Sequence, residues 1–282
     1  MLFLLLKVLS AVGMGLCLKR AEARRLDRIA VIRSNYLVAA VIAFIATVLT
    51  GEYQITRPTA LLAVATGVLF VAGLLLWANC IEKAGLALSV VALRASIVVP
   101  VLVSFIIGPE LPRRLEIVGS IVAVLALGLV LAENWPAQGP GRVRLGLAGL
   151  FLADGLANSA ARLFRHENRL HETLPFLTII FVSAFFATTI LYYLRRSPIS
   201  RSTLVYGAVL GAANLGNYLF LVLALTVLPG VVVYPVFAAA EVALMAWAGV
   251  GIWREPIGIK GWLGIGLAVV ALVLVQLGRA AG

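Results

Sequence analysis

The chain has 282 residues, of which 62% are hydrophobic and only 12% are charged, and its formal net charge is +11. A soluble domain of this length could not cover so much apolar surface, so the composition favours a polytopic membrane protein. Most basic residues lie at the ends of apolar runs rather than along one helix face. That distribution is typical of membrane proteins and argues against nucleic-acid binding. The two cysteines lie within or at the end of apolar runs, which predicts no disulfide framework.

Ten apolar segments recur along the chain, and each has roughly the 17–25 residues that a helix needs to cross the hydrocarbon of a bilayer. They cover residues 2–18, 34–50, 58–80, 85–107, 114–132, 145–164, 174–194, 203–226, 230–252 and 258–277. The connections between them are short, and none could hold a soluble catalytic domain. The sequence therefore predicts an all-α polytopic membrane protein with ten transmembrane helices.

The second half of the chain repeats the first at an offset of 145 positions, which places Glu110 on Glu255 and Gly119 on Gly264. Because each half contains an odd number of spans, the second half must enter the membrane from the opposite side. Such inverted repeats are typical of secondary transporters. The expected units are a first five-helix repeat over residues 1–138, an inverted second repeat over 142–282 and a linker at 139–141.

Two stretches share one pattern, in which a helix, a tight turn and a second helix ending at a Glu precede a Gly-rich closing helix. They are LWANCIEKAGLALSVVALRAS with GPELPRRLEIVGSIVAVLALGLVL, and LVLALTVLPGVVVYPVFAAAEVAL with WREPIGIKGWLGIGLAVVALVLV. This pattern resembles the EamA-type carriers of the drug/metabolite transporter superfamily. The resemblance implies ten helices in two inverted halves and a transport function. Where that family often has a Pro before the helix-end Glu, this chain has Ser96 and Glu241, so no specific substrate is carried over.

Three ionisable residues lie near the centres of their predicted helices: Arg94, Asp154 and Glu241. A charge at the bilayer centre costs roughly 2.5–3.5 kcal/mol on insertion scales, so each must face protein or a water-filled cavity. The offset places Arg94 and Glu241 on symmetry-related helices, less than a turn apart. They predict either an ion pair that locks two helices or a substrate site near the symmetry axis, and both alternatives stay open. Asp154 adds a second carboxylate, which could exchange protons.

Other polar and aromatic side chains are expected to line the same substrate site. They are Trp77, Asn79, Asn158, Asn214, Asn217, Tyr218 and Tyr234. No predicted span contains a histidine, and no metal or nucleophile motif occurs in the membrane, so neither an enzyme, a cofactor nor a metal site is expected.

These features predict a secondary transporter that moves a small organic metabolite, amino-acid-like or anionic, by alternating access, with proton coupling as an option. A multidrug or cation efflux carrier of the small-multidrug-resistance type is an alternative, although Arg94 would repel cations. A lipid-carrier flippase is another. The expected partners are a small-molecule substrate and the lipid bilayer, and the expected location is a bacterial inner membrane. The Lys/Arg distribution places both termini outside, whereas the resemblance implies termini in the cytoplasm.

Overall fold

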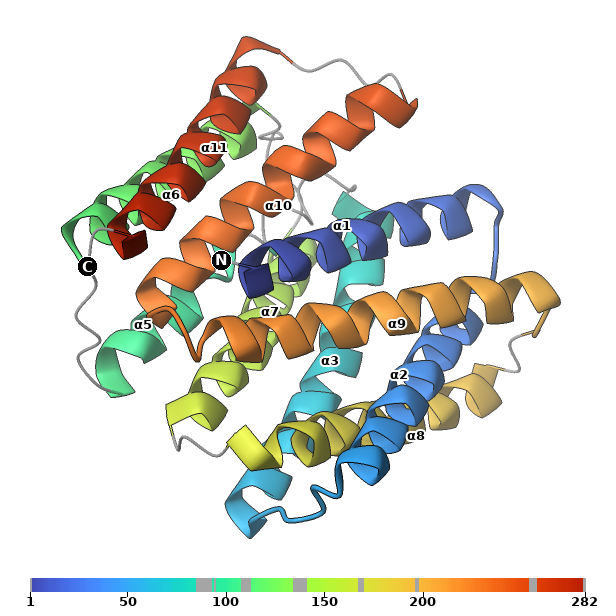
Figure 1. Cartoon of the computed structure of the whole chain (residues 1–282). Coiled ribbons are helices and arrows are strands. Elements are labelled where there is room, and N and C mark those ends of the chain that lie inside the picture. The colour runs from blue at the N-terminus through green and yellow to red at the C-terminus, as the bar shows by residue number, and fades with distance from the viewer. Residues whose placement is uncertain are drawn as a thin grey trace.

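The computed structural model describes residues 2–84, 93, 95–107, 113–133, 141–166, 170–195, 198–253 and 258–280. Within these ranges all regular structure is helical, which confirms the predicted all-α class (Figure 1). The elements are α1 (Leu2–Ala23), α2 (Arg28–Thr50), α3 (Arg57–Ala84), α5 (Val98–Ile107), α6 (Arg114–Glu133), α7 (Gly141–His166), η1 (Leu170–Glu172), α8 (Thr173–Arg195), α9 (Arg201–Ala224), α10 (Gly230–Trp253) and α11 (Ile259–Ala280). Arg94, Glu110 and Glu255 lie outside the described residues.

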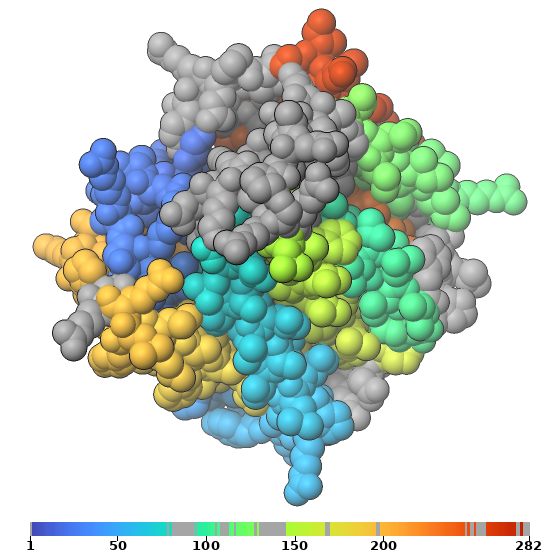
Figure 2. Space-filling model, turned by 180° about the vertical axis from the view of Figure 1, so that it is seen from behind, coloured from blue at the N-terminus to red at the C-terminus, as the bar shows by residue number. Residues whose placement is uncertain are grey.

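The helices pack into a bundle that brings distant parts of the chain side by side. α6 runs along α11, and α2 packs against both α8 and α9 (Figure 1). α3 and α7 lie side by side on the face of the molecule shown in Figure 2. The contacts also come in matched pairs: α1 packs on α9 as α7 packs on α3, and α1 packs on α10 as α7 packs on α5.

The described helices have the surface of a membrane protein. Five of them are long and apolar enough to cross a bilayer: Leu2–Ala23, Arg28–Thr50, Arg57–Trp77, Leu170–Arg195 and Arg201–Ala224. Large apolar side chains such as Leu49, Leu61 and Ile106 point outward, while Asn35 and Asn214 are buried. Lipid accepts apolar side chains at no cost, whereas polar groups must find partners inside the bundle. The distribution therefore indicates membrane insertion, and the count of ten spans stays a prediction.

Specific residues determine both ends of α2 and interrupt the regular helix geometry at two other places. Asp27 caps α2 by accepting the backbone N–H of Ala30 at 2.9 Å, and Gly51 ends that helix in the left-handed conformation. Pro235 lies inside α10 and cannot donate the usual hydrogen bond to the preceding turn. A turn at Ser96 and Ile97 precedes α5. Pro235 and the turn at Ser96 and Ile97 each interrupt the regular backbone hydrogen bonding of a helix.

Small residues bring α2 and α9 close together. A Cβ built on Gly207 would collide with the side chain of Ser34 and the backbone of α2. A Cβ built on Gly211 would collide with the carbonyl oxygen of Asn35 and would lie 3.2 Å from the backbone nitrogen of Ala39. A backbone cannot yield as a flexible side chain can, so glycine is required at this crossing.

We expect Gly211→Ala to destabilise the protein by about 1–3 kcal/mol, because the added methyl group must push α2 and α9 apart. Gly13→Ala is the matched control, since a Cβ on Gly13 would meet none of the described atoms within 4 Å. That control should be neutral or slightly stabilising, because alanine favours a helix over glycine. Thermal unfolding of the two purified variants in the same detergent measures the contrast. Equal midpoints would refute the close contact.

Candidate functional site

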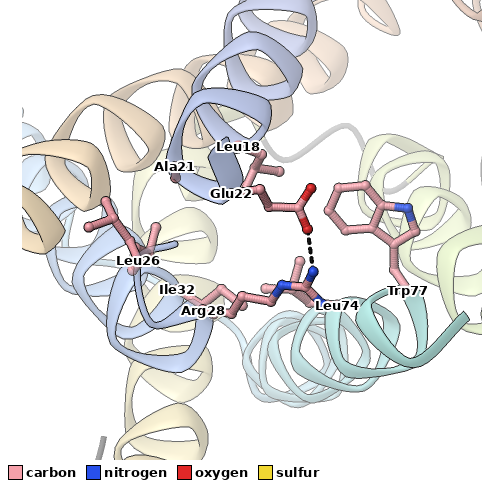
Figure 3. A pocket seen from close by; sticks show the side chains of 9 residues that line it. Leu18, Ala21, Glu22, Leu26, Arg28, Ile32, Leu74 and Trp77 are labelled. Atoms are coloured by element: carbon pink, nitrogen blue, oxygen red, sulfur yellow. Dashed lines mark hydrogen bonds and ion pairs between the residues drawn. The ribbon is translucent and has the colours of Figure 1, made fainter. Parts of the chain in front are cut away.

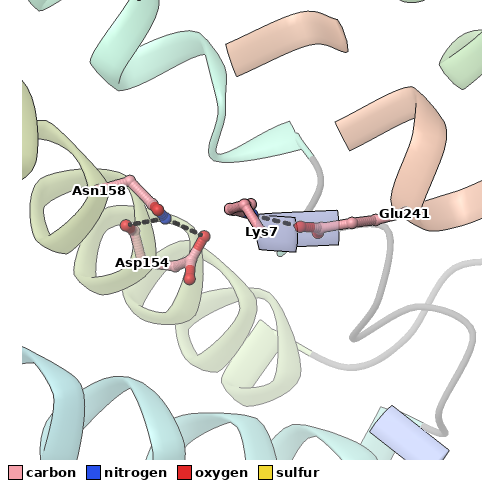
Figure 4. A network of polar contacts seen from close by, with 4 residues as sticks. All are labelled: Lys7, Asp154, Asn158 and Glu241. Atoms are coloured by element: carbon pink, nitrogen blue, oxygen red, sulfur yellow. Dashed lines mark hydrogen bonds and ion pairs between the residues drawn. The ribbon is translucent and has the colours of Figure 1, made fainter. Parts of the chain in front are cut away.

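A buried ion pair lies at the centre of the bundle and joins α1 to α10 (Figure 4). The Lys7 ammonium donates to the Glu241 carboxylate, and the two residues are only 4% and 1% exposed. The same ammonium lies 3.3 Å from the centroid of the Phe237 ring, one turn before Glu241 on α10. Electrostatic attraction to the ring face adds to the ion pair. Both contacts hold the cation of Lys7 deep among apolar helices.

A second polar group surrounds Asp154 in the middle of α7. Its carboxylate accepts a hydrogen bond from the Ser96 hydroxyl, which lies in the turn before α5. It also accepts from the amide of Asn158 at 3.2 Å, and that amide donates in addition to the Asp154 carbonyl at 2.9 Å. Asp154 is therefore positioned by a neighbour on its own helix and by a residue at a helix interruption.

Aromatic residues of α10 connect these two groups. The Tyr234 hydroxyl donates to the carbonyl of Asn158 at 3.1 Å, and the Tyr234 ring lies edge-on to Phe237 at 5.8 Å. Phe237 in turn contacts Lys7. We call the residues Lys7, Ser96, Asp154, Asn158 and Glu241 the central cluster. Figure 4 shows Lys7 between Glu241 and the Asp154–Asn158 pair.

The two halves of the central cluster occupy related positions in the sequence. At the offset of 145, Glu241 corresponds to Ser96. The same offset places Lys7 two residues before Asp154. The Lys7–Glu241 contact between α1 and α10 thus has a counterpart in the Asp154–Ser96 contact between α7 and the segment before α5. One contact is ionic and the other is a hydrogen bond, so under the predicted repeat the two halves carry different polar pairs at these helix contacts.

The central cluster combines two carboxylates, an ammonium group, an amide and a hydroxyl, with Lys7, Ser96 and Glu241 buried and Asp154 and Asn158 half-buried. Such groups can bind a polar or charged organic solute, or hold and release a proton. Among the described residues no group of three or more His, Cys, Asp or Glu side chains could hold a metal ion. The chemistry that these side chains support is ion pairing, hydrogen bonding and proton exchange.

Lys7 is the residue that the sequence analysis did not name. It lies only six residues from the N-terminus, where a lysine usually extends its ammonium to the membrane surface. In the structure, Lys7 lies on the same buried face of α1 as Leu4, Val8 and Ala11. The predicted partner of Glu241 was Arg94, which lies outside the described residues, so that pairing stays a prediction. In the structure, the ammonium group of Lys7 forms an ion pair with the Glu241 carboxylate.

The other predicted site residues are spread over several places. Asn214 donates to Asn35 at 3.2 Å and links α9 to α2 away from the central cluster. Tyr218 donates to the Ala157 carbonyl at 3.0 Å, which links α9 to α7 beside it. The Oδ1 atom of Asn217 is buried without a hydrogen-bond partner in the described part of the chain. Asn79 is exposed on α3.

Trp77 lines a pocket near the ends of α1 and α3 and the start of α2 (Figure 3). The pocket wall is mostly apolar, and its charged members are Glu22 and Arg28, whose side chains form a half-exposed ion pair. The Trp77 indole nitrogen is buried and has no hydrogen-bond partner among the described residues. The lining residues are Leu18, Ala21, Glu22, Leu26, Arg28, Val31, Ile32, Leu74 and Trp77.

Comparison with known proteins supports the fold. No protein-family profile matches the chain. An uncharacterised protein of Haemophilus influenzae is 26% identical over an alignment of 279 residues that covers 93% of this chain and 93% of that protein. A protein of known crystal structure superposes with a TM-score of 0.76 at 13% sequence identity, covering 99% of this chain and 98% of that one. The chain is therefore similar in fold, along nearly its whole length, to an experimentally determined structure.

The buried Lys7–Glu241 pair predicts a large stability effect. Lys7→Met or Glu241→Gln alone removes one partner from a buried ion pair and should destabilise the protein by about 3–5 kcal/mol. The double variant Lys7→Met/Glu241→Gln leaves neither charge and should recover most of that loss. Equilibrium unfolding in mixed micelles measures all three variants.

The exposed pair of the pocket is the matched comparison. Glu22→Gln with Arg28→Gln should change stability by no more than about 1 kcal/mol, because solvent screens exposed ion pairs. Additive losses in the Lys7/Glu241 double variant would contradict the ion pair.

Proposed function

We propose that the protein is a secondary membrane transporter that moves a small organic metabolite by alternating access, with the central cluster as the solute site. The observation that carries the proposal is the burial of Lys7 and Glu241 in an apolar bundle, with the half-buried Asp154 connected to them through Asn158, Tyr234 and Phe237. Charges at such depth are costly, and in membrane proteins they usually mark solute, ion or proton pathways. Glu241 and Asp154 are the candidate proton acceptors if transport is coupled to a proton gradient.

The arrangement of the helices supports the same proposal. The matched contacts, α1 on α10 and α7 on α5, fit two five-helix repeats of opposite orientation and ten spans. The turn at Ser96 and the proline at position 235 fit the interrupted helices that line transporter sites. We place the protein among EamA-type carriers of the drug/metabolite transporter superfamily and in a bacterial inner membrane on the sequence pattern described above.

Substrate discovery and a charge variant together test this function. The purified protein is screened by thermal shift against L-amino acids, C3–C6 carboxylates and organic amines, because a ligand of the native state raises the unfolding temperature. Each stabilising compound is then offered in radiolabelled form to proteoliposomes with and without an inward proton gradient. We expect uptake above that of empty liposomes, and a loss of at least about tenfold in Glu241→Gln, because a buried charge pair is disrupted.

The matched control is Glu52→Gln, which makes the same chemical change in the loop after α2 and should retain uptake. The transport proposal fails if no stabilising compound is taken up. The role of Glu241 fails if Glu241→Gln transports as well as Glu52→Gln. Equal thermal stability of the compared preparations, or correction for the folded fraction by size-exclusion chromatography, keeps a folding defect from imitating a loss of transport.

A further inference from the structure

A half-buried arginine lies on the contact between α2 and α8, outside the central cluster. Arg33 is five residues from the start of α2, which is about 7.5 Å along the helix axis. Its Nε atom donates to the Thr189 hydroxyl at 3.1 Å. Its guanidinium carbon lies 4.7 Å from the centroid of the Tyr192 ring and 5.4 Å from that of Phe185. We call these four residues the arginine site.

The described residues give the charge of Arg33 no carboxylate partner. Thr189 accepts the Nε hydrogen, and no described residue accepts a hydrogen bond from the terminal nitrogens Nη1 and Nη2. The two aromatic rings attract the cation but carry no opposite charge. A guanidinium presents its remaining hydrogens as a planar fork, which fits the oxygens of a phosphate in two parallel hydrogen bonds. Arg33 is therefore fixed in position by α8 while its terminal nitrogens can still bind an anion.

The helix surface beside Arg33 is apolar and exposed. Leu37 and Val41 follow Arg33 at intervals of four residues on α2, and both are exposed. On α8, the exposed Phe186 and Ile190 each directly follow a residue of the arginine site. In a membrane protein, exposed apolar side chains of this kind contact acyl chains. A lipid whose headgroup reached Arg33 could therefore lay its acyl chains along a surface of matching polarity.

The end of the bundle nearest to the arginine site is cationic. At this end α1 stops, α2 begins, α8 stops and α9 begins (Figure 1). The acidic residues described at these four helix ends are Glu22 and Asp27. The basic residues described there, besides Arg33, are Lys19, Arg20, Arg24, Arg25, Arg28, Arg195 and Arg201. This excess of positive charge attracts an anionic headgroup and repels the ammonium group of a zwitterionic lipid.

We propose that Arg33 binds the phosphate of an anionic phospholipid at the contact between α2 and α8. The phosphate accepts hydrogen bonds from the terminal nitrogens of Arg33, and the acyl chains lie along Leu37, Val41 and Ile190. A phospholipid fits this place better than a soluble phosphate, because it also covers the apolar side chains that adjoin the arginine. The site is separate from the central cluster, and the proposal holds whether or not the protein transports a solute.

Lipid binding by the full chain in a non-ionic detergent tests the assignment. Native mass spectrometry measures the dissociation constant of the first bound molecule of dioleoylphosphatidylglycerol and, separately, of dioleoylphosphatidylcholine, which has the same acyl chains. We expect the wild-type protein to prefer phosphatidylglycerol by at least about fivefold. Arg33→Gln should lower this preference by about fivefold, because one arginine near a membrane surface contributes about that factor to the binding of an anionic lipid.

Two further variants separate the arginine site from the general charge of this end. Arg201→Gln makes the same chemical change at an exposed arginine that starts α9, and it should keep the wild-type preference. Arg33→Lys keeps the positive charge but loses the planar fork, so its preference should fall below that of Arg201→Gln. The preference is a ratio of two lipids measured on one protein, so a general loss of stability in a variant affects both terms alike.

A soluble anion provides the last comparison. Inorganic phosphate at ten times the lipid concentration should not displace phosphatidylglycerol from the wild-type protein. The proposal is overturned if the wild-type protein does not prefer phosphatidylglycerol, if both Arg33 variants keep the preference, or if Arg201→Gln lowers it as much as Arg33→Gln. Displacement of the lipid by inorganic phosphate would likewise overturn the assignment to a phospholipid.

Discussion

The contact between Lys7 and Glu241 is the constraint around which the rest of the bundle is organised. Neither charge could stay at this depth alone, so α1 and α10 must be held together wherever the pair is closed. The same two helices also pack closely at a second point, where Gly15 of α1 lies against Met245 of α10. Glycine at position 15 permits the close approach of α1 and α10, and the opposite charges of Lys7 and Glu241 hold the two helices together. The N-terminal helix is therefore an integral part of the core and not a peripheral addition.

The polar contacts also explain why the middle of the bundle departs from regular helix geometry. Ser96 can reach Asp154 because it lies in a turn, where its hydroxyl oxygen also lies 2.6 Å from the Leu93 carbonyl oxygen, so its single proton is shared between two acceptors. On α10, Pro235 lies between Tyr234 and Phe237 and removes one backbone hydrogen bond of the helix. A continuous helix at either place would form all of its backbone hydrogen bonds within the helix and would restrict the directions that the side chains can take. The turn at Ser96 contacts Asp154, and Pro235 lies between Tyr234 and Phe237, which contact Asn158 and Lys7.

The lengths of the apolar segments were enough to predict the all-helical class, because each segment is as long as a bilayer is thick, whereas the ten spans stay a prediction. The same segments also identified Glu241 and Asp154, since a carboxylate in the middle of an apolar run is visible without any structure. The contact of Asp154 with Asn158 followed from their spacing of four residues on one helix. Lys7 was missed because its burial depends on the tertiary packing of α1 against α9 and α10, which the local sequence does not encode. Asn214, which was expected at the solute site, donates its amide to Asn35, and its role in binding stays a prediction.

Under the proposed transport function, the ion pair has a consequence for movement. α1 packs against α9 and α10, so a change in access that tilts one half of the bundle against the other must alter the α1–α10 contact. Separating Lys7 from Glu241 in an apolar interior is costly, which disfavours such a change in the empty protein. A solute that offers these charges new polar partners would reduce this cost. Recognition of the solute would then be coupled to movement through the contact between α1 and α10.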